Sequence, residues 1–432
     1  MCLSFIRKSR FFISARWYHS SAMEFSVKVA PSVVGAAENA GEIRRGNLSL
    51  TGRTGRMCRI ETPGCFVHTQ TGSIPHLTPD DLQYIDPAYI SNPPPLNMAL
   101  ASLSMLAPSV EAFGKPLSTF VGYPDSFVYL GLNDPLKPPK PGSNEKSSMG
   151  LWNRAGKVKV SPEAFLDLNN KLHPDMLQII CDMDTQLVGA SGQRLTKSFD
   201  SSLSWLDLFL KSRQGSPVEA VPVLATVGGG SDPWRRENFC KEVATRAVDG
   251  FVVDGFGDQW LSRWKEWEST GDLFESHKDL VSLSLRALPE TKPRFLHAPL
   301  PPKAVIYLVE MGVDMFDTSY AAALADRREA LIRTEDYAFD VISLGDQKYF
   351  EDLTPLSTRW ACYTCKNYTK AYLHHLIHCQ EINGGVLLMI HNLNEYLKFF
   401  HDLRQTIDNG SISLWKSQSS HVKVATNGNG NS

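Results

Sequence analysis

Short apolar runs alternate with amphipathic stretches from about residue 176 onward. Between the runs, apolar residues recur three and four positions apart, a spacing that predicts helices. Runs that are apolar throughout are typical of parallel strands covered on both faces. The pattern therefore predicts an α/β fold. The strand-like runs are MLQIIC (176–181), VPVLATV (221–227), GFVVDGF (250–256), RFLHAPL (294–300) and VDMFDTS (313–319).

Two parallel architectures fit this alternation, a closed (β/α)8 barrel and an open doubly wound sheet. The barrel is favoured because no GxGxxG motif follows a strand and because the body is longer than the roughly 250 residues of a typical barrel.

Polar or small residues follow these predicted strands, among them Asp182, Asp184, Asp254, His297 and Asp317. In a parallel barrel the carboxyl ends of the strands share one face, where active sites lie, so these side chains are expected to converge. The alternative for any one of them is that it begins the next loop or caps the next helix.

Composition and charge narrow the class of protein. The chain has 432 residues, 42% of them apolar, with a formal net charge of −2, which predicts a globular protein without a global basic field. No apolar run reaches the roughly 18 residues that a membrane-spanning helix needs.

Residues 1–22 hold four basic residues and no acidic one, which is typical of a mitochondrial transit segment; an ordinary frayed N-terminus is the alternative.

The eight cysteines stand at uneven intervals and predict a reducing compartment, not a disulfide framework. Cys362 and Cys365 form a C-x-x-C pair, and His391 follows later. Two thiolates and an imidazole suit Zn²⁺. From the residues alone the pair is either a zinc site or two buried cysteines.

Several long segments carry a family resemblance. RRGNLSLTGRTGRMCRIETPGCFVHTQTGSIPHLTPDDL (44–82), GVDMFD (312–317) and CYTCKNYTKAYLHHLIHCQEINGGVLLMIHN (362–392) resemble the tRNA-guanine transglycosylases, which exchange the wobble guanine of certain tRNAs for queuine or its precursors. The match runs from Met23 to about residue 405. It implies a (β/α)8 barrel with a late-inserted zinc-binding subdomain. The expected parts are a disordered or transit segment (1–22), the barrel body (23–350), the zinc-binding subdomain with the final barrel helix (351–405) and a tail (406–432).

The resemblance implies one Zn²⁺ per chain, held by Cys362, Cys365 and His391. The family pattern is Cys-x-Cys-x-x-Cys with a later His, and Trp360 stands where the first cysteine is expected. A structural zinc site takes four ligands, so this site would recruit another group, keep a water molecule or bind zinc weakly. Cys379 and His378 are candidate substitutes.

For catalysis the resemblance implies an incomplete site. Asp317 falls on the position of the nucleophilic Asp, but the Pro-Thr-Arg stretch that follows it in catalytic members is absent. The Ser-Asp-Ser-Gly-Gly-Phe-Gln loop with the second Asp is missing from residues 85–120. Asp184 aligns with the purine-binding Asp, and Asp254 falls in the wall of the base pocket.

The chain is most similar to the accessory branch of the family, which implies a non-catalytic subunit in a heterodimer with a catalytic queuine tRNA-ribosyltransferase subunit. The helix around residues 368–382 and the run 384–392 suit that interface, or pack only within their own subunit. Two other functions stay open: an active transglycosylase using Asp317, and a queuine or purine carrier using Asp184 and Asp254. The expected location is the cytoplasm, with mitochondrial association.

Direct contact with tRNA is a further expectation. The densest basic group consists of five arginines, which could contact the phosphates of an anticodon arm. Exposed arginines on such a body are as often merely solvated. The five are Arg44, Arg45, Arg53, Arg56 and Arg59.

Overall fold

The fold is described from a computed structural model of the chain. Asp184 and Trp360, both named above, lie outside the residues it describes. The described residues are 22–29, 43–137, 144–182, 190–228, 230–254, 272–335, 337–359 and 362–415.

Eight parallel strands close into a barrel in the order β10-β11-β12-β13-β4-β5-β6-β9. This confirms the predicted (β/α)8 barrel, and the strands expected from residue 176 onward lie within their apolar runs. The barrel strands are β4 (Gly64–His68), β5 (Leu96–Ala99), β6 (Val128–Gly131), β9 (Met176–Gln178), β10 (Val223–Val227), β11 (Gly250–Val253), β12 (Arg294–Phe295) and β13 (Met315–Asp317).

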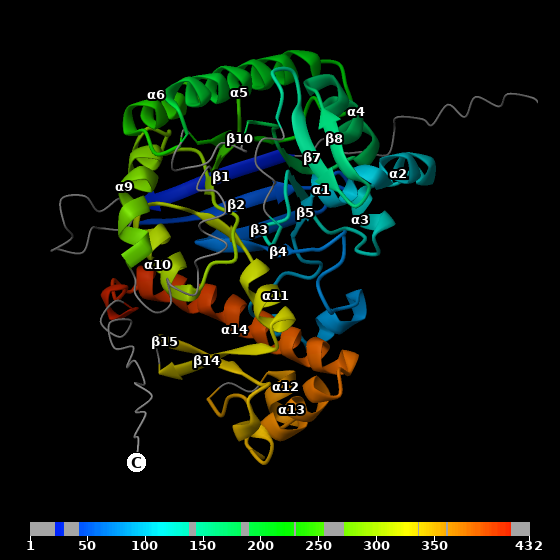
Figure 1. Ribbon diagram of the computed structural model, residues 1–432, viewed down its shortest axis with the longest axis vertical. Coiled ribbons are helices and arrows are strands. Elements are labelled where there is room, and N and C mark those ends of the chain that lie inside the picture. Colours follow the sequence, from blue (N-terminus) through cyan, green and yellow to red (C-terminus); the bar gives the residue numbers. More distant parts are fainter. Residues whose placement is uncertain are drawn as a thin grey trace, which may run out of the picture.

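Helices surround the barrel (Figure 1). Two of the longer ones begin at capping residues: the Ser191 side chain accepts a hydrogen bond from the Arg194 N–H, and the Asp232 side chain accepts one from the Arg235 N–H. The helices are α1 (Leu100–Leu103), α2 (Ala107–Phe113), α3 (Leu117–Phe120), α4 (Pro162–Leu172), α5 (Gly192–Ser212), α6 (Pro233–Ala244), α9 (Asp272–Arg286), α10 (Pro302–Glu310) and α11 (Ser319–Asp326). A hairpin of β7 (Met149–Asn153) and β8 (Gly156–Val160) precedes α4.

An antiparallel sheet closes the amino end of the barrel. It consists of β1 (Ala22–Val29), β2 (Arg44–Thr51) and β3 (Met57–Thr62). Leu48 and Leu50 of β2 pack into the interior cluster to which the barrel strands contribute Phe66 and Phe295. The barrel is therefore a filled core at this end, and any site must lie at the opposite, carboxyl end.

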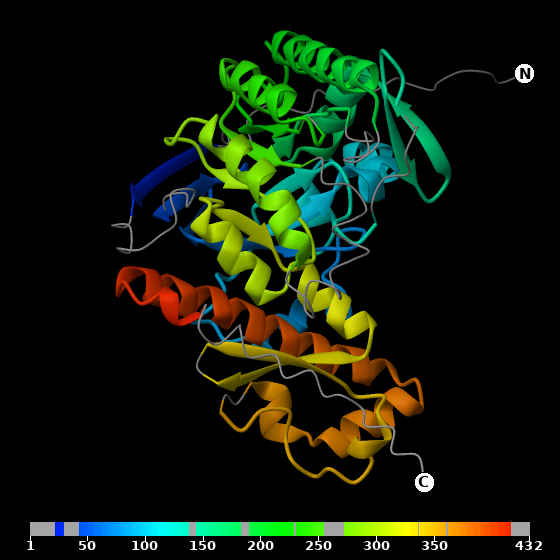
Figure 2. The ribbon, with the colours of Figure 1, turned by 60° about the vertical axis from the view of Figure 1, so that its left-hand side comes forward.

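The last part of the chain forms a lobe beside the barrel. A hairpin of β14 (Glu329–Glu335) and β15 (Ala338–Ser343) is followed by the short 3-10 helix η3 (Gln347–Tyr349), then by α12 (Tyr363–Asn367), α13 (Lys370–His378) and α14 (Ile382–Asp408). In both ribbon views α14 runs between the barrel and the rest of the lobe (Figures 1 and 2). The hairpin packs on α14, which groups it with the lobe, and the boundaries predicted at 350 and 405 stay predictions.

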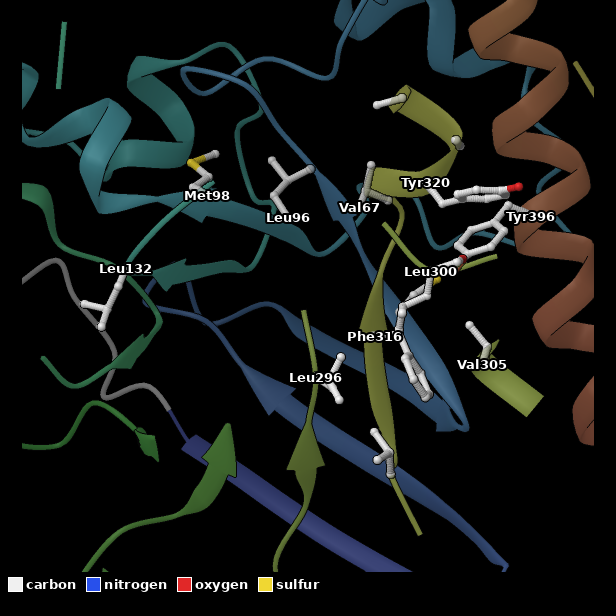
Figure 3. Close-up of a cluster of buried hydrophobic side chains, with 14 of the residues drawn as sticks. Val67, Leu96, Met98, Leu132, Leu296, Leu300, Val305, Phe316, Tyr320 and Tyr396 are labelled. Atoms are coloured by element: carbon white, nitrogen blue, oxygen red, sulfur yellow. The ribbon is translucent and has the colours of Figure 1, made fainter. Parts of the chain in front are cut away.

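Aromatic side chains fix α14 to the barrel. Figure 3 shows Tyr320 of α11 beside Tyr396 of α14, and their ring centroids are 5.7 Å apart. The Tyr396 hydroxyl donates a hydrogen bond to the Leu300 carbonyl (2.7 Å). The lobe is thus anchored through a packed and hydrogen-bonded helix. Among the described helices, none is long and apolar enough to cross a membrane.

Candidate functional site

Asp317 ends β13 at the carboxyl end of the barrel and is completely buried. Its Oδ1 accepts a hydrogen bond from the Ser319 N–H (2.7 Å), and its Oδ2 lies 3.3 Å from Nδ1 of His297. Within the described residues, Oδ2 itself forms no hydrogen bond. The predicted strand-end residues Asp317 and His297 therefore do meet and contact each other.

Aromatic rings fill the space beneath this pair. The His297 ring stacks on Tyr129 of β6 with centroids 5.0 Å apart, and neither ring nitrogen of His297 has a hydrogen-bond partner. Gln178 of β9 donates to the Thr226 hydroxyl (2.8 Å) close by. Tyr129 lies on a strand that the sequence analysis did not predict, and Gln178 lies in the predicted run 176–181 but was not named as a site residue.

His68 adds a second buried imidazole at the end of β4. Its Nε2 lies 3.7 Å from Oδ1 of Asp134, and neither of its ring nitrogens is hydrogen-bonded. Burial lowers the pKa of His68, although the nearby Asp317 and Asp134 carboxylates act in the opposite direction. The barrel end is therefore a buried polar cluster of two imidazoles and two carboxylates.

The other predicted strand-end residues have different surroundings. Asp182 binds Arg194 through two hydrogen bonds of 2.6 and 2.7 Å, which holds the start of α5. The Asp254 carbonyl accepts a hydrogen bond from Arg236 (2.9 Å). Asp184 is not described, so its predicted role in base binding stays a prediction.

A second carboxylate beside Asp317 would be required for family catalysis. The stretch 85–120 contains two acidic residues, Asp86 and Glu111. Asp86 accepts a hydrogen bond from the Ala88 N–H, and its own N–H donates to Asn394, while Glu111 is exposed on α2. Within the described part of the chain, neither forms a hydrogen bond or ion pair with Asp317.

The lobe brings together the three residues predicted as metal ligands. Cys362 precedes α12, Cys365 lies within it, and His391 comes from α14. His391 Nδ1 lies 3.5 Å from Cys362 Sγ and 3.4 Å from Cys365 Sγ, and the three ligand atoms are all within 4.8 Å of one another. They could hold one metal ion, and two sulfurs with an imidazole nitrogen are compatible with zinc.

The surroundings of His391 orient it for this role. Its Nε2 is 2.9 Å from the Leu331 carbonyl of β14, and since a carbonyl only accepts, Nε2 carries the proton. With a metal ion bound, the lone pair of Nδ1 would be directed toward the two sulfurs. A backbone carbonyl behind a histidine ligand fixes its tautomer in this way in metal sites.

The two thiols differ in acidity. A hydrogen bond from the Cys365 thiol, aided by the contact with His391, lowers the pKa of Cys362. The same contact with Cys362, together with burial, raises the pKa of Cys365. The contacts of Cys362 therefore favour its thiolate form, the form of cysteine that binds metals.

Cys379 and His378 do not belong to this group in the described residues. Cys379 is exposed at the end of α13, where its sulfur lies 3.7 Å from Nδ1 of His375. Neither candidate substitute is therefore part of the three-residue group in the described residues.

The basic group expected to contact tRNA is largely structural. Arg44 is buried and forms an ion pair with Asp314 (3.0 Å), and Arg53 is buried and donates to the Pro174 carbonyl (3.0 Å). Arg45 pairs with Asp408 (3.0 Å). The group also lies at the amino end of the barrel, far from the cluster around Asp317. The prediction was wrong for Arg44 and Arg53 because charge counting does not reveal burial.

Comparison with known proteins places the chain in a family. The family profile described as queuine tRNA-ribosyltransferase matches residues 40–423. The chain belongs to this family of tRNA-modifying transglycosylases.

Curated relatives refine the comparison. The chain is 34% identical over 381 residues to a protein of Ixodes scapularis named queuine tRNA-ribosyltransferase accessory subunit 2, covering 84% of this chain and 93% of that protein. Proteins with the same name from Xenopus tropicalis (31% over 413 residues; 87% and 95% covered) and Homo sapiens (30% over 412 residues; 86% and 95% covered) are also similar.

Proposed function

We propose that this chain is a non-catalytic accessory subunit that pairs with a catalytic queuine tRNA-ribosyltransferase subunit, which exchanges guanine for queuine at the wobble position of tRNA. In this proposal Cys362, Cys365 and His391 hold one zinc ion. The ion would join α12 to α14 and to the hairpin behind His391, and so fix the lobe as a docking element.

The burial of Asp317 carries the non-catalytic part of the proposal. A nucleophile must approach the ribose carbon to about 3–3.5 Å. Asp317 has no exposed surface, and His297 lies against its Oδ2. Loss of the second carboxylate alone would cost about 10²- to 10⁴-fold in rate, the usual contribution of a general acid or base.

An exposed apolar surface on the lobe supports the pairing. Phe350, Leu353 and Tyr372 are 61%, 76% and 44% exposed. They lie together, because the Asp352 carbonyl accepts a hydrogen bond from the Ala371 N–H at the start of α13 (2.8 Å). Apolar side chains grouped on a surface are typical of a protein interface. We name Phe350, Leu353 and Tyr372 the lobe patch and assign it to the catalytic partner.

The run 384–392, also expected at the interface, has another role. Leu388, Met389 and Ile390 are each at most 1% exposed and pack inside their own chain. The middle of this run is therefore not part of the surface that a partner could contact.

For location we propose the cytoplasm with mitochondrial association, on the basis of the basic segment 1–22. Fluorescent fusions of the full chain and of a chain starting at Met23 test this. Mitochondrial signal that depends on residues 1–22 supports it, and identical distribution of the two fusions contradicts the mitochondrial part.

Base exchange tests the main proposal. The purified chain, alone and mixed with the catalytic subunit, is given tRNA and labelled guanine. We expect no incorporation by the chain alone and incorporation by the stoichiometric pair. Incorporation by the chain alone would make it a transglycosylase in its own right. Saturable queuine binding to the lone chain, without pairing, would instead favour a carrier.

A further inference from the structure

Glu395 lies one helical turn beyond His391 on α14. Residues four apart on a helix share a face, so the Glu395 side chain projects beside the His391 imidazole. It is only 3% exposed, and its Oε2 is buried without a hydrogen-bond partner. Glu395 and Cys362 line the same cavity, of about 360 Å³. A buried carboxylate with an oxygen that forms no hydrogen bond thus lies next to the cluster of Cys362, Cys365 and His391.

The nearby cations do not neutralise this carboxylate by contact. Besides His391 of the cluster itself, Arg333 and Lys398 are the basic residues that act on Glu395 electrostatically. Both bind Asp402: Lys398 Nζ lies 3.0 Å from its Oδ2, and Arg333 forms an ion pair with the same oxygen. Carboxylates are rarely buried unless they are paired, hydrogen-bonded or bound to a metal.

We propose that Glu395 supplies the fourth ligand of the metal ion, in place of the thiolate that Trp360 does not provide. The inference rests on the proposed zinc binding by Cys362, Cys365 and His391. The carboxylate lies outside the group of atoms within 4.8 Å, so ligation involves a change of its side-chain rotamer toward the sulfurs. The resulting set of two sulfurs, one nitrogen and one carboxylate oxygen uses only ligand types that tetrahedral zinc accepts.

Ligation by Glu395 would also explain how the fourth ligand position can be filled although the family's first cysteine is absent. With three protein ligands a zinc ion keeps a water or another small ligand in the fourth position, as catalytic zinc sites do. Here that position would face the cavity lined by Cys362 and Glu395. A carboxylate from the cavity wall would occupy it and give a closed, structural site.

Cobalt substitution of the full-length chain tests this inference. The wild-type protein and Glu395→Gln are titrated with Co²⁺ and then Zn²⁺ in competition with a chelator, and the visible Co²⁺ spectrum is recorded with and without azide. We expect Glu395→Gln to weaken metal binding by about 100-fold, since loss of an outer-shell partner already costs up to about that much. We expect azide to change the spectrum of Glu395→Gln, whose fourth position is open, and to leave the wild-type spectrum unchanged.

Two further variants separate ligation from a general effect on folding. Asp86→Asn changes an exposed acidic residue of the same cavity and should bind metal as the wild type does. Trp360→Cys combined with Glu395→Gln restores the family's cysteine and should recover tight, azide-insensitive binding with stronger sulfur-to-cobalt absorption.

The outcomes are distinguishable from those of the proposed function. Unchanged affinity and spectrum in Glu395→Gln, or an azide-sensitive wild-type spectrum, would overturn the role of Glu395 while leaving zinc binding intact. Absence of metal binding by the wild-type chain would overturn both the zinc site and this inference. Neither result depends on base exchange or on the partner.

Discussion

Buried polar atoms gather in two regions, the carboxyl end of the barrel and the cysteine cluster of the lobe. The two regions differ in how these atoms are arranged. At the barrel end, Oδ2 of Asp317 lies 3.3 Å from Nδ1 of His297, and the His297 ring stacks on Tyr129, so these polar groups contact one another. In the lobe, two sulfurs and one nitrogen converge on a common point. The two regions therefore offer different chemistry, a histidine–carboxylate contact at the barrel end and a possible metal site in the lobe.

The largest effect is expected from the lobe cluster. Cys365→Ser removes one of two sulfur ligands, and because loss of an outer-shell partner alone costs about 10- to 100-fold, zinc affinity should fall by at least about 100-fold. Competition with a chromophoric chelator measures the change.

Cys379→Ser is the matched control for that experiment, since Cys379 is exposed and outside the cluster. It should bind zinc as the wild type does. Equal loss of zinc in both variants would mean that Cys379 is a ligand, and the contrast between a preformed cluster and an exposed cysteine would be lost.

The second-largest effect is expected in the barrel, at the buried ion pair of Arg44 and Asp314. Arg44→Met leaves the Asp314 carboxylate buried without its cation, and breaking a buried ion pair costs about 3–5 kcal/mol. Urea unfolding at pH 7.5 measures this loss of unfolding free energy. Zinc affinity should not change, because the pair lies at the amino end of the barrel, away from the lobe. Arg59→Met, an exposed substitution on β3, should stay within about 0.5 kcal/mol of the wild type.

The pH dependence of the Arg44→Met effect has a definite sign. Burial, only partly offset by Arg44, raises the pKa of Asp314 to about 6. A raised carboxyl pKa means that protonation favours the folded state, so the stability contribution is present at low pH and is lost as pH rises through 6. Without Arg44 this loss is larger, so the destabilisation should be greater at pH 7.5 than at pH 5. A deficit that grows on acidification would contradict this interpretation.

A smaller effect is expected at the lobe patch. Leu353→Glu places a charge on an exposed apolar site, and we expect the affinity for the catalytic subunit to fall about tenfold, or about 1.4 kcal/mol. Titration calorimetry with the purified partner measures this. Trp234→Glu on α6, which is also exposed but distant from the lobe, should leave the affinity unchanged. Equal losses in both variants would show that the lobe patch is not the docking surface.

The sequence predicted the second half of the barrel better than the first. From β9 onward each strand is followed by a helix, so the hydrophobic period is regular. Between β4 and β9 the connections contain short helices and the β7–β8 hairpin, which break that period.

The prediction of site residues was limited by the same feature, the strands that the hydrophobic pattern did not reveal. His297 and Asp317 could be predicted to meet because both follow barrel strands, and the metal ligands could be predicted from their spacing and the family resemblance. His68 and Tyr129 could not, since each lies in a strand that the pattern did not reveal. Glu395 did carry a signal, its position four residues after His391, but only its burial distinguishes it from an ordinary polar residue of a helix.

The smallest effect is expected for Asp317→Asn. This variant tests most directly whether the barrel end takes part in base exchange. Asp317→Asn keeps the shape of the side chain, and its amide oxygen can still accept the hydrogen bond from the Ser319 N–H. In a complex with the wild-type catalytic subunit, we expect labelled-guanine exchange to change by less than about twofold, whereas loss of a group that takes part in proton transfer or bond formation costs at least about 100-fold. The equivalent substitution in the catalytic subunit serves as the positive control and should abolish exchange. If Asp317→Asn abolishes it too, the buried carboxylate becomes accessible in the complex, and the barrel end would be a catalytic centre that the partner opens.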